Sequence, residues 1–350
     1  MKISTGDSHS ACIDSNGDLH VWGSNNLGRL GLGHTTNRLY PTKVNLGTKK
    51  AVEVSCGGLH TLVLCDDGKI YGTGNNHSGQ LGDGTTTSPR TSFQAVLTTG
   101  SSTLSGKTIT KVYAGGSQSY ALDSTGVVHC WGSNTSNGFL GVNTTVDIYS
   151  TPTLLDTTAG SSLQGKVVIQ VSATNVRGAT ALCDDGTVHG WGNQNSTTAY
   201  IGNGTKTNQS RPVATDVSSS SSLYDETKPN NRKHIVYISS RHRNTIAIDS
   251  DGMVHVWGRG ASGIYNTRVG DGTTEERLIP VSLSYDETLS SMFGKKGYMC
   301  TCANQGGIIV DVEGKIHGFG YIPATTSNFW GTGSTASIEA LHPVLSPTTP

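Results

Sequence analysis

Short runs of alternating apolar and polar residues recur along the whole chain, and such runs predict β-strands. Alternating runs lie at Val52–Ser55, Ile109–Tyr113, Val168–Ser172 and Ile235–Ser239. A second apolar run follows closely in each case, as at Thr61–Leu64 and Thr245–Ile248. No apolar run approaches the length of a membrane span. The pattern therefore predicts an all-β protein made of many short strands.

The predicted strands belong to a repeat that occurs six times. Each copy turns at a glycine that lies one to three residues after an aspartate, and the turn glycines are Gly17, Gly68, Gly126, Gly186, Gly252 and Gly314. Such turns favour hairpins because Asp bonds its own backbone and Gly accepts a positive φ. Each turn is followed in constant order by Trp-Gly or its equivalent, by an aliphatic-Gly-x-Gly segment such as Leu81–Gly84, and by a proline. The prolines are expected to mark an outer, edge-like strand, and they are Pro41, Pro89, Pro152, Pro212, Pro280 and Pro343.

The spacing of the repeat predicts the architecture. The turn glycines lie 51 to 66 residues apart, which is the size of a four-stranded propeller blade. We therefore predict a single closed β-propeller over residues 1–350, with the first strand near Lys2–Thr5 closing the ring beside the last blade. The six repeats lie at about 1–47, 48–96, 108–155, 167–214, 234–282 and 297–345. Seven blades are the alternative count, with a degenerate blade at 214–233 or 282–296.

The combined motif resembles the regulator-of-chromosome-condensation repeat family over essentially the whole chain. The stretch Gly68–Gly84 is the fullest match, with Gly-Lys-Ile-Tyr-Gly-Thr-Gly followed by Asn-Asn-His-Ser-Gly-Gln-Leu-Gly-Asp-Gly. The resemblance implies a β-propeller, usually of seven blades. It also implies one of three roles, which are nucleotide exchange on the small GTPase Ran, ultraviolet-B reception in plants, and service as a protein-binding platform. Fold alone does not choose among them.

Two of these roles lack the residues that the family uses for them. The exchange factor has an inserted β-wedge and a basic tail, and no basic tail is expected here, since the chain begins in its first repeat and ends at Ser346–Pro350. The photoreceptor relies on Gly-Trp-Arg-His-Thr motifs, which do not occur. Four of the five tryptophans hold the Trp-Gly position five residues after the turn glycine, and the fifth is Trp330. The protein-binding platform needs no fixed motif.

Charge and cysteine content narrow the expected partners and compartment. Lys plus Arg and Asp plus Glu number 25 each, so the formal net charge is zero. A nucleic-acid-binding protein normally carries a basic excess, so we expect no nucleic-acid partner and no membrane insertion. The segment Met1–Gly6 lacks the apolar core of a signal peptide, and the seven cysteines have no disulfide spacing. We therefore expect synthesis in the cytoplasm with free thiols.

The residue three positions after each turn glycine is the most suggestive chemical feature. It is His20, Tyr71, His129, His189, His255 or His317. Zinc needs its ligand nitrogens within about 2.1 Å of one point, whereas equivalent residues of different blades are spread around a ring. We expect these rings to pack between blades, with a ring nitrogen bonded to backbone.

Other candidate sites are weaker. Cys300-x-Cys302 lacks a second pair for zinc, and Asp83 and Asp271 bring too few oxygens for calcium. No phosphate-loop or nucleophile-elbow motif occurs. We predict no catalytic residues, no metal and no cofactor.

Four long segments after the proline strand are where the copies differ most: 97–107, 155–166, 214–233 and 282–296. The first two share a Ser-Ser-(Thr)-Leu-x-Gly-Lys core. Because all four occupy the same slot, we expect them on one side of the ring, where loops on a rigid scaffold usually bind. The last two each contain Tyr-Asp-Glu-Thr, which gives the candidate partner-binding residues Tyr224, Asp225, Glu226, Tyr285, Asp286 and Glu287. The tyrosines would be anchors and the acids the polar rim.

The sequence therefore favours a non-catalytic propeller that acts as a protein–protein interaction or structural module. The context we expect is an accessory protein (decoration, collar or host-contact) of a phage or virus particle. One alternative is a guanine-nucleotide exchange factor for a small GTPase, with 214–233 as its wedge. The other is a glycan-binding propeller, with Tyr224, Tyr285 and Trp330 as exposed aromatics. Shortening 214–233 is expected to weaken partner binding without changing the melting of the fold.

Overall fold

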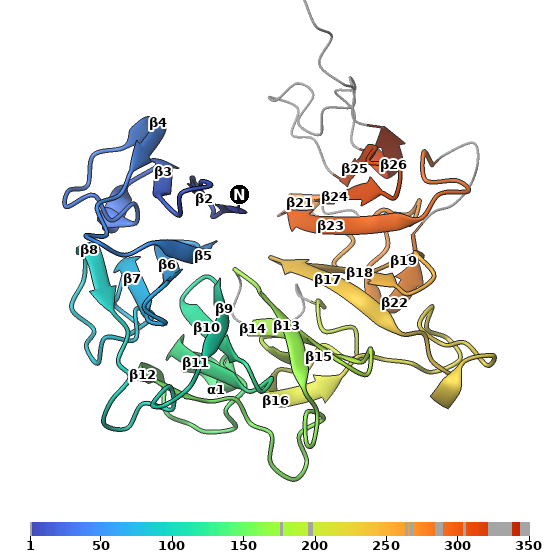
Figure 1. The fold of residues 1–350 in the computed structure, drawn as a ribbon. Helices are drawn as coiled ribbons and strands as arrows, with labels where there is room; N and C mark the ends of the chain where they lie inside the picture. Colours follow the sequence, from blue (N-terminus) through green and yellow to red (C-terminus); the bar gives the residue numbers. More distant parts are fainter. Residues whose placement is uncertain are drawn as a thin grey trace, which may run out of the picture. The chain divides into compact units, whose positions relative to one another are not determined.

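The computed structural model describes residues 2–175, 178–194, 199–262, 265–266, 269–283, 290–303, 306–320 and 338–343. Its regular structure is almost entirely β (Figure 1), with six four-stranded antiparallel sheets and one small sheet of two short strands. Helix in the described residues is limited to the short turns α1 (Thr135–Gly138), η1 (Asn26–Gly28) and η2 (Pro229–Asn231). The predicted all-β propeller of six four-stranded blades is confirmed.

Each sheet lies within one copy of the repeat. The first three consist of β1 (Lys2–Thr5), β2 (His9–Ile13), β3 (Leu19–Gly23) and β4 (Arg38–Lys43); β5 (Ala51–Cys56), β6 (His60–Cys65), β7 (Ile70–Gly74) and β8 (Arg90–Ala95); and β9 (Ile109–Ala114), β10 (Gln118–Asp123), β11 (Val128–Ser133) and β12 (Ile148–Leu154). The others consist of β13 (Val168–Ala173), β14 (Gly178–Cys183), β15 (Val188–Gly192) and β16 (Gln209–Ala214); β17 (Ile235–Arg241), β18 (Asn244–Asp249), β19 (Val254–Gly258) and β22 (Arg277–Ser282); and β23 (Gly297–Ala303), β24 (Gly306–Asp311), β25 (Ile316–Gly320) and β26 (Ile338–Pro343). The two short strands are β20 (Ala261–Ser262) and β21 (Tyr265–Asn266).

Within every sheet the strands follow one another in chain order. An antiparallel meander returns to the same end after every second strand, so the Asp-Gly hairpin and the exit from the fourth strand share one end of the sheet. Backbone bonds confirm this, since the amides of Ala51 and Val168 donate to the hairpin carbonyls of Gly17 and Gly126 at 2.8 and 3.1 Å. We call this end of each sheet, with its hairpin turn and the segment leading to the next sheet, the loop end.

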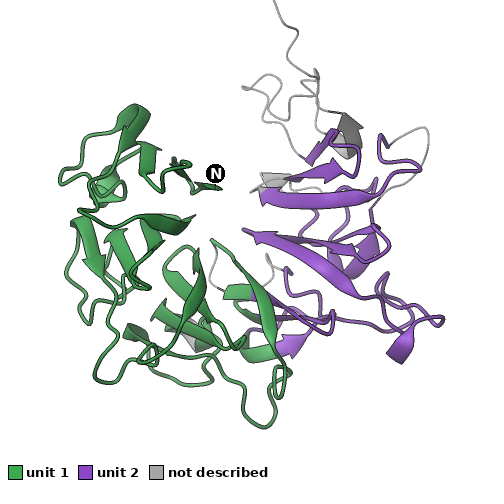
Figure 2. Ribbon diagram, in the orientation of Figure 1, with its two compact units in different colours: residues 1–179, 191–193, 209–212 green, residues 180–190, 194–208, 213–350 purple. Residues whose placement is uncertain are grey.

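The chain divides into two compact units (Figure 2). Unit 1 comprises Met1–Ala179, Trp191–Asn193 and Gln209–Pro212, and unit 2 comprises Thr180–Gly190, Gln194–Asn208 and Val213–Pro350. In unit 1 the first strands β1, β5, β9 and β13 contact one another in order, and in unit 2 β17 contacts β23. The closure of the ring by Lys2–Thr5 and the single domain over 1–350 stay predictions.

The core between successive sheets explains two motifs of the repeat. Trp131, Trp191 and Trp257 are completely buried. The indole N–H of Trp131 donates to the Gln80 carbonyl at 2.9 Å, and its ring lies over Gly82, where a Cβ would come within 2.8 Å of Nε1. The Leu-Gly motif therefore has glycine because the next sheet's indole occupies the place of a side chain.

The second copy builds the same core from different residues. Thr73 stands at the tryptophan position, and the strand register puts Phe93 where β4 has Pro41. The Phe93 ring lies against Gly31, where a Cβ would be 2.4 Å from Cε2, so Phe93 fills the space of the missing indole. Pro89 was expected in the outer strand, but it lies just before β8.

Candidate functional site

The long loops at the loop end fasten each sheet to the next. In 97–107, the amide of Thr103 donates to the carbonyl of Pro152 on the next sheet at 3.1 Å. The Thr103 hydroxyl lies 2.8 Å from His129 Nδ1, and the adjacent Leu104 is buried in the core between the two sheets. A polar residue and an apolar residue in succession thus close the junction.

The same arrangement recurs in three further loops. The amides of Ser162 and Ser222 donate to the carbonyls of Pro212 and Pro280 at 3.1 and 2.9 Å. The hydroxyls of Ser222 and Ser291 lie 2.8 and 2.6 Å from Nδ1 of the next sheet's histidine. We call these hydroxyl–apolar pairs loop plugs, and they are Thr103-Leu104, Ser162-Leu163, Ser222-Leu223 and Ser291-Met292. Each apolar member is buried.

The histidine at each plug also contacts the hairpin of its own sheet. Its Nε2 lies 3.4 Å from a carboxylate oxygen of Asp123 in the third sheet, and 3.0 Å from Asp249 and from Asp311 in the fifth and sixth. In the fourth sheet, where Cys183 replaces the aspartate, His189 Nε2 lies 2.8 Å from the Thr187 hydroxyl. The partners of the ring nitrogens are therefore side chains, and the expectation of a backbone partner is wrong. The sequence could not show this, because the hydroxyl comes from a loop that precedes the sheet.

Burial and hydrogen bonding set the protonation states of the histidine and of the hairpin aspartate. Burial lowers the pKa of His129 and of His255, against the opposing effect of the neighbouring aspartate. Burial alone would raise the pKa of Asp123, but hydrogen bonds from Thr125, the Val127 amide and His129 bring it to about 2. A neutral imidazole therefore lies between a hydroxyl and a charged carboxylate.

Such a chain has the composition of a Ser-His-Asp catalytic triad, yet its setting favours a structural role. His129, His255 and His317 are at most 1% exposed, so a substrate would not reach the imidazole. The same groups recur in several sheets, where each links a loop to a hairpin. We therefore infer that these hydroxyl–imidazole–carboxylate groups attach one sheet to the next.

Two further searches concern the described part of the chain only. No group of three or more His, Cys, Asp or Glu side chains is placed there to hold a metal ion. No helix in those residues is long and apolar enough to cross a membrane. All seven cysteines are free thiols, and burial raises the pKa of Cys302 to about 12.

The predicted partner-binding residues of 214–233 lie directly after a plug. Tyr224 is half-buried and forms a β-bridge with Arg232. Asp225 Oδ1 accepts bonds from the amide and hydroxyl of Thr227 at 3.0 and 2.6 Å, which lower the pKa of the carboxyl. Glu226 is exposed. Asp225 therefore shapes its own loop, while Glu226 and one face of Tyr224 remain available to a partner.

The other predicted residues cannot be placed in the same way. Tyr285, Asp286, Glu287 and Trp330 lie outside the described residues. Partner binding by all of the candidate residues stays a prediction.

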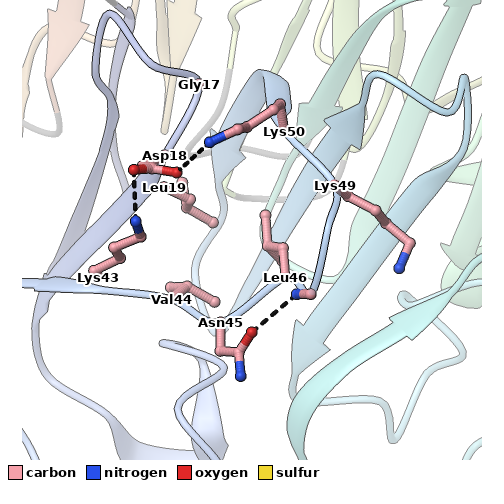
Figure 3. Close-up of a pocket in the computed structure, with 10 residues that line it drawn as sticks. Gly17, Asp18, Leu19, Lys43, Val44, Asn45, Leu46, Lys49 and Lys50 are labelled. Carbon is pink, nitrogen blue, oxygen red and sulfur yellow. Dashed lines mark hydrogen bonds and ion pairs between the residues drawn. The ribbon is translucent and has the colours of Figure 1, made fainter.

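A surface depression lies at the loop end between the first two sheets, and no sequence pattern indicated it. It has two adjoining parts of about 370 and 600 Å³ that share the segment Asn45–Gly47 and two lysines. In the first part, Lys43 and Lys50 contact Asp18 at 2.6 and 2.9 Å (Figure 3). Their hydrogen bonds lower the pKa of Asp18 to about 2.

Comparison with protein families now identifies the repeat. Residues 16–64 match the model of the regulator of chromosome condensation (RCC1) repeat, and residues 2–29 and 51–80 match a second model of this repeat. The chain contains RCC1 repeats. This confirms the resemblance found in the motifs.

Curated relatives of this RCC1-repeat chain are larger proteins. It is 39% identical over 141 residues to the mouse X-linked retinitis pigmentosa GTPase regulator, covering 40% of the chain and 14% of that protein. It is 29% identical over 280 residues to the Arabidopsis thaliana ultraviolet-B receptor UVR8, covering 80% of the chain and 56% of the receptor. The chain thus spans less than two thirds of the length of both relatives.

Solved structures agree in fold. Human WBSCR16 matches with a TM-score of 0.75 at 21% identity, over 99% of this chain and 81% of that one. Yeast RCC1 (Prp20), solved with Kap60, matches with a TM-score of 0.70 at 16% identity, over 99% and 75%. At these identities the likeness concerns the RCC1-type fold alone.

Proposed function

We propose that this RCC1-repeat chain is a non-catalytic protein-interaction module that binds its partner at the loop end. The observation that carries the proposal is that loop 216–234, the stretch between the core positions Thr215 and Ile235, combines a buried anchor with an exposed tip. Its plug residue Leu223 is 2% exposed and belongs to the core of unit 2. The following turn is exposed at Glu226 and at Pro229–Asn231. Because a buried residue anchors this loop, the exposed tip can present its side chains with little loss of conformational freedom on binding.

The names of relatives support a protein partner. One relative is called a GTPase regulator, another is the human E3 ubiquitin-protein ligase HERC2, and the yeast structure is a complex with Kap60. These words describe those proteins, and a partner for this chain remains our proposal.

The structure gives less support to the alternative functions that were expected from the sequence. A wedge in a GTPase would need an extended loop, but the tip of 216–234 folds back on itself, with the Asp225 amide bonded to the Asn231 carbonyl at 3.1 Å. For glycan binding, Tyr224 is half-buried, and the other two candidate aromatics lie outside the described residues. The names of the relatives given above do not refer to a phage or virus particle, and this context stays a prediction to be tested by locating the protein in purified particles.

The test removes the tip and keeps the plug. Shortening the entire segment 214–233 is not a clean test, because Leu223 and the Ser222–His255 bond would be lost with it. We therefore revise the expectation of unchanged melting and expect that shortened protein to melt at a lower temperature. Residues 226–230 are instead replaced by Asn-Gly, which forms a two-residue turn. We expect normal melting and at least a tenfold weaker retention of the native partner, measured by quantitative mass spectrometry of the co-purified protein.

The matched control is His77→Ala, which alters an exposed residue between β7 and β8, at the opposite end of its sheet. This control should retain the partner in full. Unchanged retention by the tip variant, or an equal loss in His77→Ala, would show that the tip does not bind the partner.

A further inference from the structure

The junction between the first two sheets differs from the other junctions in having no loop plug. The segment between the corresponding core positions is six residues long, 45–50, against twelve in 97–108 and in 156–167. It reads Asn-Leu-Gly-Thr-Lys-Lys and has no hydroxyl residue directly before an apolar one. The second sheet also has Tyr71 where the plugged sheets described above have the histidine that receives the plug. Tyr71 instead donates to Asp67 at 2.6 Å.

The missing plug leaves a groove of about 600 Å³ between β4 and β8. Its apolar lining includes Leu32, Leu46 and Phe93, all of them only partly buried at the edge of the local core. The carbonyl of Phe93 corresponds to that of Pro152, which receives the Thr103 amide at a plugged junction. Within residues 2–175, no amide of 45–50 donates to the Phe93 carbonyl. An acceptor for a peptide backbone is therefore left at the edge of the groove.

The groove also contains Lys49, which lacks the carboxylate partner that the corresponding lysine has at other junctions. Lys49 lies two residues before the core position Ala51, as Lys107 lies two before Ile109. At three of the four plugged junctions the corresponding lysine faces the hairpin aspartate, at 3.8 Å for Lys107 and Asp123. In the second sheet that aspartate is replaced by Cys65, three residues before the turn glycine, as it is by Cys183 in the fourth sheet. The Lys49 ammonium lies over the Tyr71 ring, 5.3 Å from its centre.

The neighbouring lysines do not share this situation. Figure 3 shows Lys43 and Lys50 directed at Asp18, with Lys49 pointing away from that carboxylate. The positive charge facing the groove is thus that of Lys49. A ligand carboxylate would supply the pairing that Lys107, Lys233 and Lys295 have within the chain.

We propose that this groove binds an extended segment of a partner protein that carries a leucine-sized side chain next to a carboxylate. The chain's own plugs show what fits such a junction. A backbone amide would donate to the Phe93 carbonyl, the apolar side chain would cover Leu46 and Phe93, and the carboxylate would pair with Lys49. The inference rests on the proposed function only in treating the chain as a protein-binding module, and it involves a different loop from 216–234.

The probe is a fluorescein-labelled, amidated peptide, Gly-Asp-Thr-Leu-Ser-Asp-Gly, titrated by fluorescence anisotropy against the full chain. We expect saturable binding with a dissociation constant below about 1 mM. Lys49→Gln should weaken it about tenfold, and so should exchanging Leu for Ala in the peptide. The control Lys69→Gln, an exposed lysine on the neighbouring hairpin, should leave binding unchanged.

A second variant tests the geometry by filling the groove. Replacing 45–50 with the sequence of 97–108 introduces a plug, and peptide binding should then be lost while the protein melts at or above the normal temperature. The inference is overturned if the peptide does not bind, if Lys49→Gln binds as well as the parent, or if a folded plugged variant still binds. The tip variant of 216–234 should bind the peptide normally, so the two proposals can fail separately.

Discussion

Truncating one core tryptophan measures how much the junction between two sheets contributes to stability. Trp131 is completely buried, and replacing it by alanine removes its ring from the space above Gly82. Large-to-small core substitutions of this kind cost about 3–5 kcal/mol. The hydrogen-bond share should be small, because the Gln80 carbonyl would keep its second donor, the Ser119 hydroxyl at 2.6 Å. We therefore expect Trp131→Phe, which keeps an aromatic ring, to cost clearly less than Trp131→Ala.

The free energy of unfolding is measured by urea titration followed by circular dichroism. Trp22→Ala is the matched control, since Trp22 holds the same repeat position but is only partly buried, and it should cost less than half as much. A loss below about 1 kcal/mol for Trp131→Ala, or equal losses for the two alanine variants, would refute the assignment of this residue to the core. Loss of partner binding with unchanged stability would show that Trp131 belongs to a binding site.

Two further predictions concern the plugs and acidification. Leu163→Ala should lower the free energy of unfolding in urea by about 2–5 kcal/mol, because Leu163 is 1% exposed. Leu46→Ala, at a partly buried position, should lower it much less, and equal losses would contradict the plug assignment. Burial lowers the pKa of His60 to about 4 from about 6.5 in an unfolded chain, so the unfolded state binds the proton first and stability should fall as the pH drops from 6.5 to 4. The slope is at most about 1.4 kcal/mol per pH unit for one histidine, and His129 and His255 act in the same direction. A free energy of unfolding that is flat or rising on acidification over this range would contradict it.

Features that depend on neighbours along the chain could be predicted from the sequence. The hairpins follow from glycine at the turn, and Gly17 and Gly126 indeed have φ of 74° and 82°. The blade count and the burial of Trp131 follow from the period, since every copy must bury the same face against the next. The sequence motif shared by 97–107 and 155–166 could be recognised, but its role as a loop plug could not.

What could not be predicted depends on compensation between distant positions. Phe93 replaces the bulk missing at Thr73, which lies on the adjacent strand, and only the strand register shows it. The groove follows from the combination, at one junction, of a short segment, a tyrosine in place of the histidine and Cys65 in place of the hairpin aspartate. Each of these looks like ordinary variation of a repeat until the other junctions show what normally fills the space.

The most direct test of binding at the loop end is cross-linking of the natively purified protein to its bound partner, with the linked lysines identified by mass spectrometry. Lys107 and Lys228 lie on loop-end segments, whereas Lys206 lies between β15 and β16 at the opposite end of its sheet. The account predicts cross-links from Lys228 and from other loop-end lysines such as Lys233. In the variant with residues 226–230 replaced, which itself lacks Lys228, the cross-links from the remaining loop-end lysines should disappear. Cross-links concentrated at Lys206, with none from the loop end, would contradict it.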